Sequence, residues 1–215
     1  MAARFADRTS AGAELGQLVA ERGVAPDTVV LGLPRGGVPV AAGVAQAVGA
    51  PLDMLVVAKL RVPSQPELAF GAVASGGVRW LNDDVVSAAR LPPDLVERLT
   101  AAELEAVAER ERRLRPGRVQ IPVAGRSVVL VDDGMATGAT MRAAVEAARL
   151  LGAAGIIVAS PLATPAVVAS FDRVADRADV LEIRAAFGAV SVLYGRFPQV
   201  GEDEVARLLT AAPAG

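Results

Sequence analysis

The chain has 215 residues and is 53% hydrophobic but only 3% aromatic, which excludes a disordered or fibrous protein and favours helices packed on buried parallel strands. Its formal charge of −2 gives no basic surface that would hold nucleic acid. The sequence contains neither cysteine nor histidine, which excludes disulfides, thiolate or histidine metal sites and Ser-His-Asp catalysis. Chemistry is left to carboxylates, Arg or Lys, hydroxyls, backbone amides and a hard cation such as Mg²⁺.

The first part of the chain alternates between helix and strand patterns. The predicted elements are a helix over 7–23, a strand over 28–33, a helix over 38–48 and a strand over 53–58. This alternation is typical of a parallel sheet covered by helices. After it we expect an exposed loop over 59–65.

The alternation is then interrupted. Residues 70–74 and 78–81 flank a Ser-Gly-Gly turn and predict a hairpin. Residues 91–115 predict a charged helix that starts near two prolines. Its Glu and Arg residues alternate in sign, which indicates a solvated helix face and not a nucleic-acid surface.

The last part of the chain returns to the α/β alternation. The predicted elements are strands over 127–132, 156–160 and 180–183, and helices over 140–151, about 165–175 and 202–210. We therefore expect one α/β domain over 1–215, made of a core (about 24–60 and 126–184), an insertion (about 61–120) and a C-terminal hood or tail (about 185–215). No segment reaches the roughly 18 apolar residues of a membrane span, and the polar N-terminus does not resemble a signal peptide, so we expect a cytoplasmic protein.

Residues 128–140, VVLVDDGMATGAT, carry the most informative pattern. Asp132 and Asp133 follow a buried strand, at the edge of an α/β sheet where ligands bind. The small-residue loop after them enters a helix, whose free N–H groups and dipole attract phosphate. Thr137 and Thr140 add hydroxyl donors, and Gly138 permits close approach. The segment pairs a phosphate cup with carboxylates that suit a sugar diol or a hydrated Mg²⁺.

Other interpretations of the acidic pair fit less well. A P-loop NTPase needs a G-x-x-x-x-G-K-[ST] loop, which this sequence lacks. A haloacid-type phosphatase places its two aspartates two positions apart, and a receiver domain carries its acidic pair near the N-terminus. The pair could also simply cap a turn. The coincidence of strand, acidic pair, T-G-A-T loop and helix favours a ligand site.

This segment resembles the signature of the type I phosphoribosyltransferases, which bind 5-phosphoribosyl 1-diphosphate (PRPP). The chain is also similar to a bacterial subgroup of predicted phosphoribosyltransferases that share GLPRGG, A-K-L, PELA-GAV and DDGxATGAT. The resemblance implies a parallel sheet flanked by helices, with a hairpin and helical insertion and a small C-terminal hood. It implies that Asp132 and Asp133 bind the ribose hydroxyls and, through water, Mg²⁺. The 5-phosphate would be wrapped by Ala136, Thr137, Gly138, Ala139 and Thr140.

A second motif, LGLPRGG at 31–37, supports the resemblance. Its glycines expose backbone N–H groups beside an arginine that can grip phosphate. The turn is similar to the S-R-G-G turn of bacterial xanthine–guanine phosphoribosyltransferases, which implies that Arg35, Gly36 and Gly37 bind PRPP. In relatives this turn often contains a non-proline cis peptide, here expected at Pro34–Arg35 or Arg35–Gly36.

Lys59 is the only lysine among the 22 basic residues. Lys59 and Arg61 stand where the family commonly carries a flexible loop that closes over pyrophosphate. The resemblance therefore implies catalytic roles for both, beside Asp132 and Asp133. The alternative is a pair of solvated loop cations.

The resemblance implies an enzyme of nucleotide metabolism or base salvage that transfers the phosphoribosyl group of PRPP–Mg²⁺ to a nitrogenous base and releases pyrophosphate. Ala136 stands where 6-oxopurine enzymes carry an aspartate, which disfavours a 6-oxopurine acceptor. Aromatic rings that could stack on a base, or simply pack, are Phe187, Tyr194, Phe197 and Trp80.

Two other functions remain open at this point. The fold also serves as a non-catalytic PRPP-sensing or protein-interaction module, for which the helix over 91–115 could be an arm, and a phosphatase or pyrophosphatase is a third option. The basic residues Lys59 and Arg61 favour catalysis, because a sensor has no need to expel pyrophosphate. We expect no nucleic-acid or membrane partner and, by analogy with the family, a homodimer.

Overall fold

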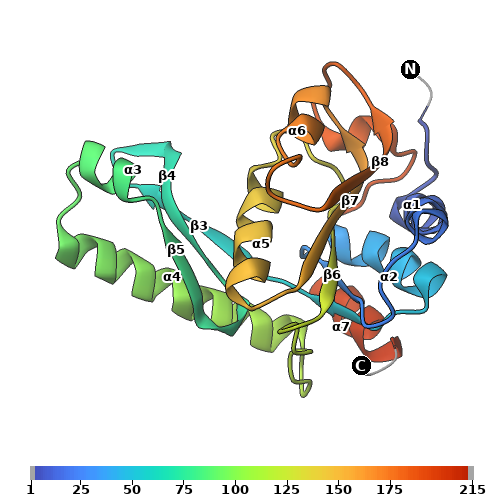
Figure 1. Ribbon diagram of the computed structural model, residues 1–215, viewed down its shortest axis with the longest axis horizontal. Coiled ribbons are helices and arrows are strands. Elements are labelled where there is room, and N and C mark those ends of the chain that lie inside the picture. Colours follow the sequence, from blue (N-terminus) through green and yellow to red (C-terminus); the bar gives the residue numbers. More distant parts are fainter. Residues whose placement is uncertain (1–2, 213–215) are drawn as a thin grey trace.

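The computed structural model describes residues 3–212, in which a five-stranded parallel sheet with helices on both faces is joined to a smaller antiparallel sheet (Figure 1). The parallel strands lie in the order β2-β1-β6-β7-β8. Their bounds are Val29–Gly32 (β1), Leu52–Met54 (β2), Ser127–Val131 (β6), Gly155–Ala163 (β7) and Arg177–Ile183 (β8). The predicted α/β fold with a parallel sheet flanked by helices is confirmed.

Strands β1 and β6 are buried on both faces, as parallel strands between two layers of helices must be. The helices around them are α1 (Arg8–Arg22), α2 (Gly37–Val48), α5 (Ala139–Leu150), α6 (Pro165–Ala169) and α7 (Glu202–Ala211). Val30 and Val129 pack in one hydrophobic cluster with side chains of α1 and α2. Leu31 and Leu130 pack in a second cluster with α5. This alternation follows from the two-residue period of a strand.

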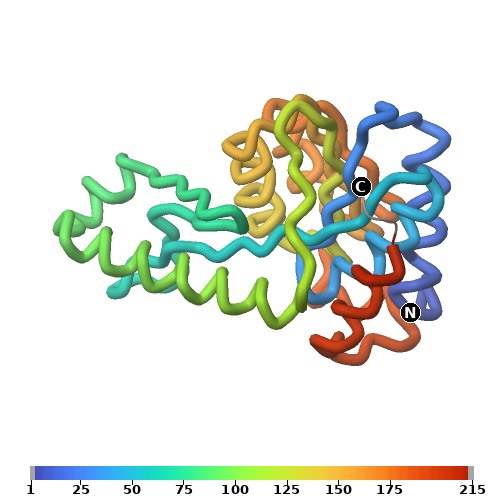
Figure 2. The backbone as a smooth tube through the Cα atoms, turned by 90° about the horizontal axis from the view of Figure 1, so that it is seen from below, coloured from blue at the N-terminus to red at the C-terminus, as the bar shows by residue number. Residues whose placement is uncertain are grey.

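Between β2 and β6 the chain leaves the sheet and forms an arm, which comprises residues 57–114. It contains the antiparallel strands β3 (Val57–Val62), β4 (Gln65–Ala74) and β5 (Val78–Leu81), with a 3-10 turn at Ser75–Gly77, and the helices α3 (Asp83–Ala88) and α4 (Pro93–Leu114). Figures 1 and 2 both show the arm projecting to one side of the parallel sheet, with α4 running along its strands. The C-terminal end of α4 also contacts α7, where Arg113 pairs with Glu202.

The exposed loop predicted over 59–65 is wrong. Residues 59–65 are mostly strand and not an exposed loop, because 59–62 belong to β3 and only 63–64 turn into β4. Lys59 pairs with Ala72 across the ladder, and Leu60 and Val62 are buried while Arg61 is exposed. The charged residues therefore alternate with the buried ones at the period of a strand, and their charge made the segment resemble a loop.

Smaller differences occur elsewhere. The predicted strand over 53–58 divides into β2 and β3, because residues 55–56 leave the parallel sheet. The helix predicted over about 165–175 ends at Ala169, and α3 was not expected. The hairpin and the charged helix of the arm are confirmed. Within the described residues, no helix has the length and apolar composition needed to cross a membrane.

Candidate ligand-binding site

The acidic pair stands at the carboxyl end of β6, beside the loop that opens α5. Asp132 lines a pocket of about 170 Å³ together with the loop of residues 134–141, which includes all five residues predicted to hold a phosphate. Gly138 has a left-handed backbone (φ 66°) and no side chain to cap α5, and the first N–H of the helix, that of Ala139, donates to Thr137 Oγ1 at 3.4 Å. The following N–H groups of the first turn can bind an anion in this pocket.

Asp133 does not line that pocket, and one of its carboxylate oxygens is bound to Arg8. Its Oδ2 accepts a hydrogen bond of 2.8 Å from Arg8 Nε, and both side chains are largely buried. Gly36 lies so close to the same oxygen that any Cβ there would clash with it. The Asp133 backbone carbonyl accepts a 2.7 Å hydrogen bond from the Tyr194 hydroxyl. Asp133 thus joins β6 to the N-terminal helix and to the C-terminal hood.

Arg8 itself is held from three sides. Asp7 caps α1 through a hydrogen bond with Ser10, which fixes the first turn that carries Arg8. Its guanidinium donates to the Pro198 carbonyl oxygen at 2.8 Å and lies 3.6 Å from the centre of the Phe197 ring. Sequence reasoning missed Arg8, because nothing in its neighbourhood indicates a partner 125 residues away.

The two carboxylates differ in electrostatics. Burial, followed by the charge of Asp133, raises the pKa of Asp132 to about 8, while the Asp133 backbone N–H and Arg8 oppose the rise. Burial and the neighbouring carboxylate therefore favour the protonated form of Asp132. An incoming cation or hydroxyl donor would favour its ionised form.

The glycine-rich turn after β1 lies directly against the acidic pair. Strands β1 and β6 are neighbours, and Leu33 N donates to Val131 O at 2.8 Å. A Cβ on Gly37 would come within 2.5 Å of Val131 O, so the close approach of the two loops requires glycine there. The Pro34–Arg35 peptide is cis. The structure thus brings the turn with Arg35, Gly36 and Gly37 together with Asp132 and Asp133.

Lys59 and Arg61 lie on β3 and line a different pocket, of about 350 Å³, between β3 and α4. Arg61 is exposed and donates to Pro66 O. Burial, Arg61 and Arg142 lower the pKa of Lys59, and Glu67 opposes them. Since Arg142 also donates to Thr137 O at 2.8 Å, the positive field at Lys59 includes a residue that braces the phosphate loop.

Arg110 is a further residue that sequence reasoning missed. It comes from α4, whose charge pattern indicated only a solvated face. The structure places Arg110 in the same pocket as Lys59, and its Nη2 donates to Pro34 O at 3.1 Å.

The aromatic rings of the hood pack and do not stand free to stack on a base. Tyr194 is 6% exposed and contacts Phe5 and Phe197, with which it forms a small cluster. Phe187 packs against the same cluster. Trp80 is 40% exposed on the arm, where it faces side chains of α5.

Comparison with known proteins adds independent information. A family model described as a phosphoribosyl transferase domain matches residues 15–183. Proteins of Mycobacterium tuberculosis strains CDC 1551 and H37Rv, each named as a candidate phosphoribosyl transferase, are 50% identical over 211 residues, covering 97% of this chain and 47% of theirs. The chain thus spans about half the length of these curated relatives. The crystal structure of TT1426 from Thermus thermophilus is 39% identical with a TM-score of 0.85, covering 98% of this chain and 100% of that one.

Proposed function

This chain belongs to the phosphoribosyl transferase family, and we propose that it binds PRPP with Mg²⁺ and transfers the 5-phosphoribosyl group to a nitrogenous acceptor, releasing pyrophosphate. One observation carries the proposal. The Asp132 carboxylate and the uncapped N-terminus of α5 share a single pocket, so a phosphate and a sugar hydroxyl of one ligand could be bound side by side.

Different residues of the site would bind the 5-phosphate, the ribose and the diphosphate of PRPP. The loop over 136–140 takes the 5-phosphate, and Asp132 accepts from a ribose hydroxyl. Asp133 holds the pair in place through Arg8 and offers its remaining oxygen. The turn over 35–37 takes the diphosphate, where an arginine fork suits phosphate oxygens.

The donor chemistry of the site fits a Mg²⁺ ion that arrives with the substrate. No cluster of three or more acidic residues that could hold a metal ion gathers in residues 3–212, so these residues alone do not form a complete cage for the ion. Mg²⁺ typically takes one or two carboxylates, with water and substrate phosphates completing its shell. Asp132 and the free oxygen of Asp133 are the residues that would hold it, and the ion would neutralise charge on the departing diphosphate.

The reaction forms a bond from the acceptor nitrogen to C1 of the ribose as the C1–O bond breaks and the electron pair leaves with the diphosphate. This chain contributes position and electrostatics, which are the main requirements of such a step. The absence of histidine is therefore no obstacle. Ala136 places no carboxylate next to the phosphate loop, so we expect an acceptor other than a 6-oxopurine.

Calorimetric titration with PRPP and Mg²⁺ tests the proposal. The wild-type protein and Asp172→Asn, which removes an exposed carboxylate, should bind saturably, whereas Asp132→Asn should not. A panel of nitrogenous bases is then screened for pyrophosphate release. Binding with no turnover by any base would favour the PRPP-sensing alternative, and no binding by the wild type would reject both functions.

A further inference from the structure

Three cations near the site lack acidic partners. Many arginines of this protein form ion pairs, but in the part of the chain that the structure describes no carboxylate lies within ion-pair distance of Arg35, Lys59 or Arg110. All three side chains are half-buried. Cations in such positions are costly unless an anion compensates them.

Other cations surround Arg110 and Lys59. Burial and then Arg35 lower the pKa of Arg110, Arg113 acts in the same direction, and Glu202 opposes them. Lys59 experiences the same combination of burial and like charge from Arg61 and Arg142, against Glu67 alone. A site that concentrates positive charge in this way favours a ligand with several negative charges.

The geometry connects the cluster to the glycine-rich turn. Arg110 and Lys59 line one pocket of about 350 Å³ between α4 and β3, with Leu60 and Leu99 among its apolar walls. Glu103 is the acidic residue of this pocket and forms no ion pair with Lys59 or Arg110, so the cations Lys59, Arg61 and Arg110 outnumber it. One nitrogen of Arg110 reaches back to the carbonyl of Pro34, the residue before Arg35. Arg110 thus stands between the arm pocket and the turn proposed to hold the diphosphate.

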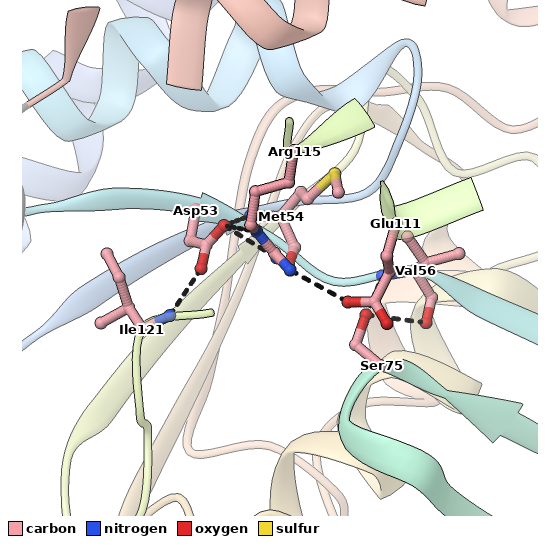
Figure 3. Close-up of polar contacts among 7 residues, drawn as sticks. All are labelled: Asp53, Met54, Val56, Ser75, Glu111, Arg115 and Ile121. Atoms are coloured by element: carbon pink, nitrogen blue, oxygen red, sulfur yellow. Dashed lines mark hydrogen bonds and ion pairs between the residues drawn. The ribbon is translucent and has the colours of Figure 1, made fainter. Parts of the chain in front are cut away.

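The base of the arm is fixed by a buried polar network, which Figure 3 shows. Asp53 accepts from Arg115 Nε at 2.9 Å and from Ile121 N at 2.8 Å, and Arg115 donates to Met54 O and Glu111. This network joins the strand that leads into the arm to the helix that leads out of it. Lys59 lies on β3, which follows this strand, and Arg110 precedes Glu111 on α4, so the network holds together the two parts of the chain that carry them.

We propose that Arg110 is a diphosphate-binding residue which, with Lys59, makes the arm one wall of the diphosphate site, beside Arg35 of the glycine-rich turn. This inference rests on the proposed function. It assigns a role in PRPP binding to the long helix of the arm, which lies outside the sequence motifs of the site. The planar guanidinium of Arg110 has five N–H donors, of which Pro34 O takes one, and the others suit phosphate oxygens.

Calorimetry with three probes tests the assignment: PRPP with Mg²⁺, pyrophosphate with Mg²⁺, and ribose 5-phosphate. We expect Arg110→Gln to weaken binding of PRPP and pyrophosphate by at least tenfold and to leave ribose 5-phosphate unchanged. The matched control is Arg113→Gln, which removes the same charge one turn further along α4, where the side chain is exposed and faces Glu202. Arg110→Lys, which keeps the charge and loses the fork, should fall between wild type and Arg110→Gln.

The possible outcomes distinguish a failure of the Arg110 assignment from a failure of the proposed function. If wild type binds PRPP and Arg110→Gln binds it equally well, or is weakened no more than Arg113→Gln, the assignment of Arg110 is wrong and the function stands. If Arg110→Gln weakens all three probes alike, Arg110 is only structural. If wild type binds none of the probes, the proposed function fails and the inference with it.

Discussion

Replacing Asp53 with asparagine should strongly destabilise the protein. Asp53 is 3% exposed and Arg115 is 7% exposed, so the ion pair between them is shielded from water. Removing one partner of a buried pair costs about 3–5 kcal/mol, because the other charge is left uncompensated. Arg115 keeps Glu111 and the Met54 carbonyl, which places Asp53→Asn near about 3 kcal/mol, at the lower end of that range.

The assay is urea unfolding at pH 7, followed by circular dichroism, with thermal unfolding in parallel. For a chain of this size about 3 kcal/mol corresponds to a fall in Tm of roughly 6–12 °C. The control is Asp94→Asn, which removes an exposed partner of Arg98 on α4 and should change the free energy of unfolding by less than about 0.5 kcal/mol. A change of that small size for Asp53→Asn would refute the reasoning.

A double-mutant cycle identifies the cause of the loss. If the uncompensated Arg115 charge is the problem, Arg115→Met in the Asp53→Asn background should cost far less than it does in wild type. If the two losses simply add, the network stabilises the base of the arm only through independent contacts.

Three further predictions concern the site. Arg8→Met leaves Asp133 buried without its partner, so we expect a loss of about 2–3 kcal/mol in urea unfolding and weaker PRPP binding by calorimetry, and an unchanged midpoint would contradict it. Because the pKa of Asp132 is raised to about 8, the free energy of unfolding should fall as the pH rises from about 4 to about 8, and Asp132→Asn should flatten that slope in Tm measurements across this range. Gly36→Ala should abolish PRPP binding, because a Cβ clashes with Asp133, whereas Gly188→Ala, with open space around it, should bind as wild type does.

The strands and the loop of the acidic pair could be predicted because local patterns determine them. Continuous apolar runs identify β1 and β6, and the small residues after Asp133 favour a loop that leads into a helix. The hydrogen-bonding partners of those strands place the glycine-rich turn beside the acidic pair, although the two motifs are almost 100 residues apart.

The roles of Arg8 and Arg110 could not be predicted, because they depend on how distant elements pack. Arg8 acts across 125 residues and Arg110 across 76, and neither belongs to a recognisable motif. The strand character of β3 was missed for a related reason. In sequence Lys59 and Arg61 resemble solvated loop residues. Only the antiparallel pairing with β4 shows that they belong to a strand.

The two aspartates of the acidic pair have different contacts, which only the structure reveals. In sequence the two aspartates are equivalent, but in the structure their carboxylates have different surroundings although both lie against the glycine-rich turn. Asp132 lines the pocket of the α5 loop, and Asp133 contacts Arg8. The Asp133 N–H donates to Asp132 Oδ1 at 2.9 Å, and the Asp133 carbonyl oxygen accepts from Tyr194. Asp133 therefore connects the pocket residue Asp132 to the C-terminal segment as well as to the N-terminal helix. Ionisation of Asp132 by a bound cation or hydroxyl donor would therefore add a negative charge beside a carboxylate that Arg8 already compensates.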